Sequence, residues 1–183
     1  MAVLLAAIAS LTGVPTQPFD LLFAPPTLLP LAGRCALVTG ASGGIGRATA
    51  CALALQGMDL VLVARREERL RELKEEIERR GLPGSVTVVA GDVTTDALYE
   101  ELRQSGCLAK VDTLINNAGL ARGVARVGEA TAADWKEMLD ANCYGAFRMV
   151  NEVIQYSSPL VLTTNFKRLI GLRHLVRSQR GAG

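Results

Sequence analysis

The chain has 183 residues, 49% of them hydrophobic, and its formal net charge is +2 at pH 7. A chain of this length suits one globular domain that buries roughly two-thirds of its unfolded surface. Its near neutrality argues against a general nucleic-acid-binding protein.

Residues 1–33 are an apolar, proline-rich leader with a single charged side chain, Asp20. The apolar stretch 3–9 is far shorter than the about 20 residues that a membrane-spanning helix needs, so we expect no membrane span. No basic segment precedes this stretch, as it would in a signal peptide. The prolines after it break any helix and predict an irregular extension: Pro15, Pro18, Pro25, Pro26 and Pro30.

The four cysteines, Cys35, Cys51, Cys107 and Cys143, form no Cys-x-x-Cys pair, and His174 is the only histidine. We therefore expect neither a metal site nor a disulfide framework in this chain. A reduced, cytoplasmic protein fits this pattern best. A targeting role of the leader is the alternative.

From Arg34 onward, apolar runs of strand length alternate with segments of helical pattern. The predicted strands are residues 35–39, 59–64, 86–90 and 113–116, and the predicted helices between them are 44–56, 67–80 and 96–105. This alternation predicts an α/β fold with a doubly wound parallel sheet of about four strands, Rossmann-like but incomplete. We assign residues 34–156 to this dinucleotide-binding domain.

A glycine-rich turn joins the first predicted strand to the first helix at residues 39–46, Thr-Gly-Ala-Ser-Gly-Gly-Ile-Gly. In this context backbone N–H groups and the positive end of the helix face a pyrophosphate, and side chains at the close-approach glycines would block it. A purely structural turn is the alternative interpretation. The predicted cofactor-binding residues of the turn are Gly40, Ser42, Gly43, Gly44, Ile45 and Gly46.

The end of the second predicted strand bears on the choice between NAD and NADP. An NAD enzyme places a carboxylate there, where it holds the ribose hydroxyls and repels a 2′-phosphate. This strand instead ends Ala64-Arg65-Arg66, with no carboxylate before Glu67. The arginines therefore predict NADP as the cofactor, through charge-assisted contacts with the phosphate. Alternatively, they only begin an exposed charged helix.

The spacing Thr-Gly-x-x-x-Gly-x-Gly resembles that of the short-chain dehydrogenase/reductase family, over about residues 34–155. The resemblance implies that Asp92 and Val93 contact the adenine. It also implies that the Asn116-Asn117-Ala118-Gly119 motif steadies the sheet and lies along the cofactor, with Asn117, Ala118 and Gly119 as cofactor contacts. Asn142, after Asp134-Trp135, matches the Asn of the family's catalytic tetrad. Members of the family are usually homo-oligomers.

Within the family, Ala64–Ile77 and Asn116–Gly123 look most like the NADP-dependent 3-hydroxy acid dehydrogenases, a group that includes enzymes oxidising serine or allo-threonine. The implied partners are NADP(H) and a small hydroxy or carbonyl substrate. Related carbonyl reductases fit nearly as well.

The chain departs from the family where the chemistry is expected. The family uses a Tyr with a Lys four residues later and an upstream Ser, but Tyr99, Tyr144 and Tyr156 are followed at that spacing by Arg103, Arg148 and Leu160. General acid–base work on an alcohol needs such a tuned phenol. Ser157 and Ser158 follow Asn142 too closely to be the family's serine, so we interpret them as loop residues.

We therefore expect a C-terminally truncated member of the family, with a divergent tail at residues 157–183. The tail has no acidic residue, and its five basic ones suggest a solvated segment: Lys167, Arg168, Arg173, Arg177 and Arg180. Residues 161–164 could form a short strand and 166–177 a basic helix. Without the rest of the family's sheet, we expect the fourth strand to have an unpaired edge.

Two functions follow from this pattern. Either the gene product is an NADP-dependent oxidoreductase whose reaction needs residues that this chain lacks, or the polypeptide is a non-catalytic NADP(H)-binding or regulatory fragment.

Overall fold

The computed structural model describes residues 31–121, 131–157 and 162–165. Most of the predicted leader and residues 166–183 of the predicted tail, with its basic helix, lie outside the described residues. The boundaries assigned to these two segments therefore stay predictions.

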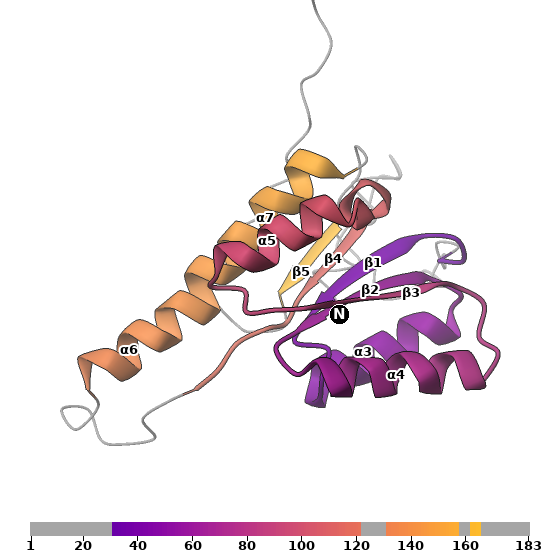
Figure 1. Cartoon of the computed structure of the whole chain (residues 1–183), viewed down its shortest axis with the longest axis horizontal. Helices are drawn as coiled ribbons and strands as arrows, with labels where there is room; N and C mark the ends of the chain where they lie inside the picture. The colour runs from indigo at the N-terminus through magenta and orange to yellow at the C-terminus, as the bar shows by residue number, and fades with distance from the viewer. Residues whose placement is uncertain (1–30, 122–130, 158–161, 166–183) are drawn as a thin grey trace, which may run out of the picture. The chain divides into compact units, whose positions relative to one another are not determined.

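The core of the fold is a parallel sheet whose strand order is β3-β2-β1-β4-β5 (Figure 1). The first four strands have the predicted bounds: β1 Cys35–Thr39, β2 Asp59–Ala64, β3 Val86–Ala90 and β4 Thr113–Asn116. The chain leaves β1 toward β2 and β3 and returns to place β4 on the other side of β1. In open α/β sheets, ligands bind at the carboxyl ends of the strands beside such a switch point.

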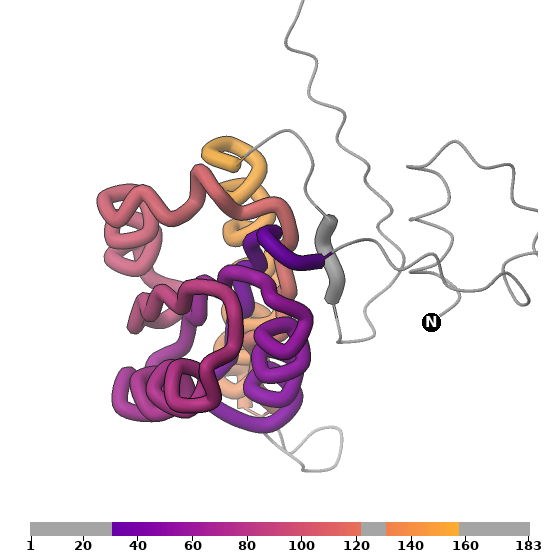
Figure 2. The backbone as a smooth tube through the Cα atoms, turned by 90° about the vertical axis from the view of Figure 1, so that its right-hand side faces the viewer, coloured from indigo at the N-terminus to yellow at the C-terminus, as the bar shows by residue number. Residues whose placement is uncertain are grey.

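The helices cover both faces of this sheet, as the doubly wound prediction requires (Figures 1 and 2). Helices α3 and α4 lie on one face, and α5 and α7 on the other. The first three end one residue before their predicted ends. The helical segments are α3 Gly44–Leu55, α4 Glu67–Arg79, α5 Asp96–Gln104, the short 3₁₀ turn η1 Cys107–Lys110, α6 Ala132–Leu139, the π-helical turn η2 Asp140–Tyr144 and α7 Gly145–Tyr156.

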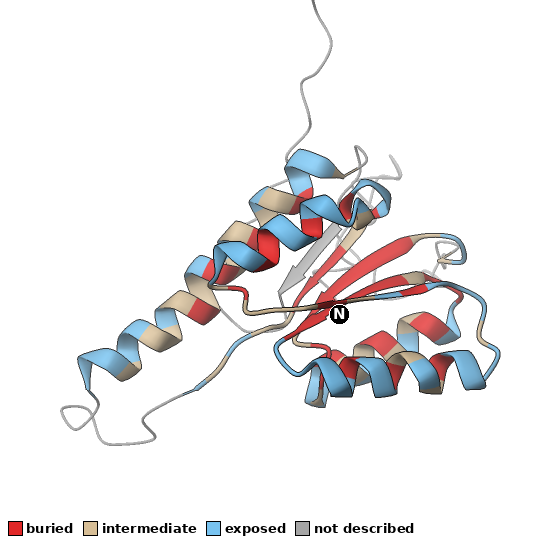
Figure 3. Ribbon diagram, in the orientation of Figure 1, coloured by how far each residue is buried: buried red, intermediate tan, exposed pale blue. Residues whose placement is uncertain are grey.

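Two apolar cores separate the sheet from its helices, because successive side chains of a strand point to opposite faces. On β1, Ala36 and Val38 pack with α3 and α4, whereas Leu37 packs with α5 and α7. Every residue of β1 is buried, as expected for a central strand that is covered on both sides. Figure 3 shows the buried residues gathered on the strands and on the helix faces turned toward them.

The expectation of an unpaired β4 edge is wrong. A fifth strand, β5 Leu162–Asn165, pairs with β4 in parallel, with Leu114 opposite Thr163 and Asn116 opposite Asn165. The sheet therefore has five strands instead of about four. The short strand considered at residues 161–164 is therefore present one residue later, and its backbone satisfies the hydrogen-bonding groups that β4 would otherwise expose.

Among the described helices, none is long and apolar enough to cross a membrane.

Candidate functional site

The glycine-rich turn carries the chain from the end of β1 into α3, and two of its glycines are required by close contacts. Gly40 has a φ of +68°, and a Cβ atom there would lie 2.8 Å from the side-chain nitrogen of Asn117. A Cβ on Gly46 would lie 2.4 Å from the carbonyl oxygen of Gly40. Real side chains do not fit at these distances, so the turn packs this closely only with glycine.

The start of α3 lies in this turn and has no side-chain cap. Gly43 is the N-cap residue in an extended conformation, and the first helical hydrogen bond to it comes from Arg47 N at 3.3 Å. The first turn of a helix leaves backbone N–H groups without intrahelical acceptors, and the helix dipole adds positive potential there. A negatively charged ligand group at this end would satisfy both.

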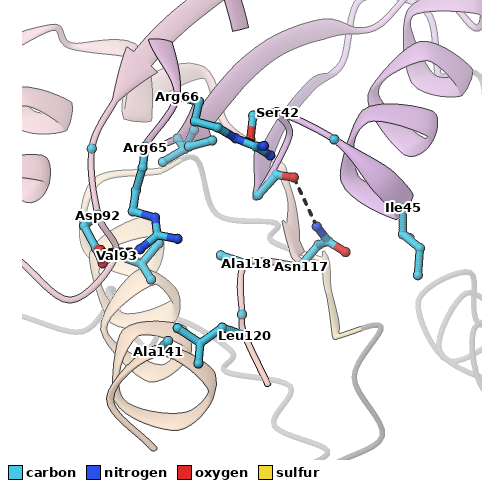
Figure 4. A pocket seen from close by; sticks show the side chains of 16 residues that line it. Ser42, Ile45, Arg65, Arg66, Asp92, Val93, Asn117, Ala118, Leu120 and Ala141 are labelled. Atoms are coloured by element: carbon cyan, nitrogen blue, oxygen red, sulfur yellow. Dashed lines mark hydrogen bonds and ion pairs between the residues drawn. The ribbon is translucent and has the colours of Figure 1, made fainter. Parts of the chain in front are cut away.

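Thr39, at the end of β1, joins the glycine turn to the loop after β4 through hydrogen bonds. Its hydroxyl oxygen accepts hydrogen bonds from the backbone N–H groups of Asn117, at 2.9 Å, and Ala118, at 2.8 Å. In return, the Asn117 amide donates to the carbonyl oxygen of Thr39 at 3.1 Å. It also lies 3.4 Å from that of Gly40, a contact dashed in Figure 4. Asn116 connects the same loop to α7, because its side-chain amide donates to Ala146 O at 2.7 Å. The two loops therefore form one rigid unit.

The two arginines after β2 point to different partners (Figure 4). The Arg66 guanidinium donates to Ser42 Oγ from Nη2 at 3.0 Å and from Nε at 3.3 Å, which brings it over the glycine turn. Within the described ranges no carboxylate pairs with Arg66. Arg65, whose side chain is 67% exposed, instead forms an ion pair with Asp92 at 3.6 Å.

Asp92 and Val93 follow β3 and form the wall of the site opposite the glycine turn. The Asp92 carboxylate accepts hydrogen bonds from the backbone N–H and the hydroxyl of Thr94, at 2.9 and 2.8 Å. This contact fixes the carboxylate in the orientation that reaches Arg65. Val93 is buried, and it lines the site beside Asp92.

These segments enclose a pocket of about 350 Å³ at the carboxyl ends of the strands. Every predicted cofactor-binding residue lines it except Gly44 and Gly46, which lie within the first turn of α3. Five further lining residues were not predicted: Val63, Ala64, Gly91, Leu120 and Ala141. All but Val63 adjoin a predicted site residue, and Val63 lies one residue before the end of a predicted strand, which was the available signal.

Asn142, the predicted catalytic Asn, lies in η2 and binds the loop after β4. Its side-chain oxygen accepts a hydrogen bond from Leu120 N at 2.9 Å, and its amide nitrogen donates to Leu120 O at 2.8 Å. The side chain therefore holds a pocket-lining backbone segment without lining the pocket itself. The π-helical turn supplies this placement, and such turns often occur at functional sites.

No tyrosine of the described segments lines the pocket. Tyr144 is 54% exposed and Tyr156 47%, whereas Tyr99 is fully buried. Burial raises the pKa of Tyr99 to about 12, so this phenol stays protonated at neutral pH. None of the three therefore stands where it could exchange a proton with a molecule bound in the pocket.

Comparison with known proteins supports the resemblance found in the sequence. The family model for short chain dehydrogenases matches residues 34–159. Sulfoacetaldehyde reductase 2 of Chromohalobacter salexigens is 38% identical over 119 residues, which are 64% of this chain and 46% of that protein. An NADP-dependent 3-hydroxy acid dehydrogenase of Escherichia coli K12 is 36% identical over 120 residues, covering 64% and 46%.

The fold agrees with solved structures as well. The crystal structure of L-sorbose reductase from Gluconobacter frateurii, complexed with NADPH and L-sorbose, superposes with a TM-score of 0.61 and 32% sequence identity. The match covers 69% of this chain and 49% of that one. The chain thus spans about half the length of the relatives that it matches.

Proposed function

The chain belongs to the short-chain dehydrogenase family, and on this premise we propose that its pocket binds NADP(H) in preference to NAD(H). The family consists of oxidoreductases that bind a nicotinamide cofactor. One relative is named for its NADP dependence, and the L-sorbose reductase was solved with NADPH.

The pocket fits the parts of such a cofactor in order. The close-packed glycine turn and the uncapped start of α3 would hold the pyrophosphate. Arg65, Asp92 and Val93 would enclose the adenosine, and the loop at 117–120 would lie along the nicotinamide half. When bound, the nicotinamide ring gives or takes a hydride.

The observation that carries the NADP preference is the Arg66–Ser42 contact. The guanidinium lies over the glycine turn without a carboxylate partner among the described residues, beside the positive end of α3. Two positive groups this close repel one another until an anion lies between them. A 2′-phosphate at this point would satisfy both, together with the Ser42 hydroxyl, whereas a ribose hydroxyl would not.

Replacing Arg66 tests the preference. We expect Arg66→Ala to raise the Kd for NADPH about 10- to 100-fold, because a hydrogen bond to a charged group contributes about 1.5–3 kcal/mol. The Kd for NADH should change less than about 2-fold. Arg69→Ala is the matched control, since it removes the same charge from an exposed position of α4 that does not line the pocket. Equal losses for NADPH and NADH would contradict the proposal.

For the whole protein, we propose hydride transfer between NADP(H) and a hydroxyl or carbonyl substrate such as a 3-hydroxy acid. The 183-residue polypeptide itself contains no Tyr-x-x-x-Lys pair. We expect the polypeptide alone to bind the cofactor without turnover, which would make it a non-catalytic NADP(H)-binding or regulatory fragment. An NADPH oxidation assay with carbonyl substrates decides this point: activity that survives a second, orthogonal purification would refute it.

A further inference from the structure

Tyr99 lies in α5, behind the pocket, and its hydroxyl joins two segments that are far apart in the sequence. It donates to the carbonyl oxygen of Val93 at 2.7 Å and lies 3.3 Å from that of Gly145. Val93 lines the pocket, and Gly145 is the first residue of α7. The hydroxyl thus ties the wall of the pocket after β3 to the helix behind it.

Val93 packs tightly against the start of α7 on the side away from the pocket. A Cβ atom on Gly145 would lie 2.8 Å from Val93 Cγ2 and 3.0 Å from Val93 O, so α7 begins in direct contact with this residue. On its other side Val93 faces the pocket, next to Asp92. A displacement of Val93 would therefore change the pocket more readily than it would change the core.

Arg148, from α7, packs against the ring of Tyr99. Its guanidinium carbon lies 4.1 Å from the centre of the Tyr99 ring, and Nη2 forms an ion pair with Asp96 at 2.6 Å. Asp96 begins α5, the helix that carries Tyr99. The cation over the ring face and the pair with Asp96 both hold α5 against α7.

A core-filling role alone does not explain the hydroxyl. Phe would fill the same space, whereas Tyr places a donor on the carbonyl of a pocket-lining residue. A buried carbonyl without a donor is unfavourable, so the backbone at Val93 would relax without this hydroxyl.

We propose that Tyr99, supported by Arg148, is a positioning residue for the adenosine half of the cofactor. It acts through Val93, whose place it sets, and touches no ligand itself. This inference rests on the proposed binding of NADP(H) in the pocket. Its signature is a loss of affinity shared by all adenine-bearing ligands, in contrast to the loss for NADPH alone that is expected from Arg66.

The test compares Tyr99→Phe with the wild-type chain, using calorimetric Kd values for NADPH, NADH and 2′,5′-ADP. We expect Y99F to raise all three Kd values by a common factor of about 2 to 10, the size of one lost hydrogen bond. Tyr156→Phe removes an exposed hydroxyl and serves as the matched control. Leu108→Ala, in the buried core away from the pocket, controls for lost stability and should lower Tm with unchanged Kd values.

Three results would overturn the inference. Y99F could lower Tm and leave every Kd unchanged, in which case Tyr99 is structural only. It could raise the Kd for NADPH but not the Kd for 2′,5′-ADP, and its effect would then lie outside the adenosine half of the cofactor. If Y99F does not fold, Arg148→Gln carries the test, because it keeps the hydroxyl and removes the cation; unchanged Kd values in this variant would refute the proposal.

These outcomes are distinct from failure of the proposed function. If the wild-type chain binds neither NADPH nor 2′,5′-ADP, the NADP(H) proposal is wrong and this inference falls with it. If the wild-type chain binds both ligands and Y99F matches it, only the role of Tyr99 is wrong.

Discussion

Replacing Thr39 by Val should destabilise the fold through the loss of one buried hydroxyl group. Thr39 is 0% exposed, and its hydroxyl oxygen is the acceptor for two backbone donors, Asn117 N and Ala118 N. Valine keeps the shape of the side chain and removes the acceptor from both donors at once. The perturbation therefore isolates hydrogen bonding from packing.

The expected cost follows from those two contacts. Asn117 N also donates to Ile115 O at 3.0 Å, so Ala118 N is the donor that loses its acceptor. A buried donor left without an acceptor costs about 1–3 kcal/mol. Domains of this kind have an unfolding free energy of about 5–15 kcal/mol in total. Thr39→Val should therefore lower the free energy of unfolding measurably and loosen the contact between the glycine turn and the loop after β4.

Urea unfolding followed by far-UV circular dichroism measures this effect. Thr39→Ser is the control, because it keeps the acceptor and loses one methyl group, at a cost of about 0.8 kcal/mol. We expect the valine variant to be about 1 kcal/mol less stable than the serine variant, with an unchanged m-value. Valine and serine variants of equal stability would refute the claim that Thr39 joins the two loops through its hydroxyl.

Two further predictions concern the turn and the buried phenol. Gly46→Ala should lower the free energy of unfolding by several kcal/mol and raise the Kd for NADPH at least about 10-fold, because its Cβ would lie 2.4 Å from Gly40 O. Gly44→Ala has open space around its Cβ but a φ of +54°, so it should lower the free energy of unfolding by only about 1–2 kcal/mol. Similar unfolding midpoints for the two variants would contradict this contrast. Burial raises the pKa of Tyr99 from 10.0 to about 12, so the stability linked to its neutral form is present below pH 10 and is lost as the pH rises toward 12. That loss amounts to about 2–3 kcal/mol. The stability of Tyr99→Phe should fall less steeply over this window, and an absorbance titration at 295 nm should lack its last step; a wild-type chain without this late step would contradict the prediction.

The elements and the glycine turn could be predicted from the sequence because their signals are local. Continuous apolar runs between turns report strands buried on both faces, and the four strands predicted this way have the observed bounds. The helices ended within one residue of prediction, because glycines such as Gly57 and Gly81 mark where the chain must turn with positive φ. Each of these features depends on residues that are neighbours along the chain.

The pairing of β5 with β4 and the partners of the site residues depended on tertiary structure instead. Arg65 and Arg66 are equivalent in the sequence, yet one pairs with Asp92 after β3 and the other with Ser42 in the glycine turn. Asn142 was predicted as catalytic, and the fold places it on the backbone of Leu120.

The contacts of the Tyr99 hydroxyl could not be predicted from the sequence, because its partners lie 6 and 46 residues away. Their segments meet only when α5 and α7 pack against the same face of the sheet. The local pattern of a sequence determines which backbone conformation and which face a residue adopts. The atom that a side chain finally contacts is decided by which distant segments the packed sheet brings beside it.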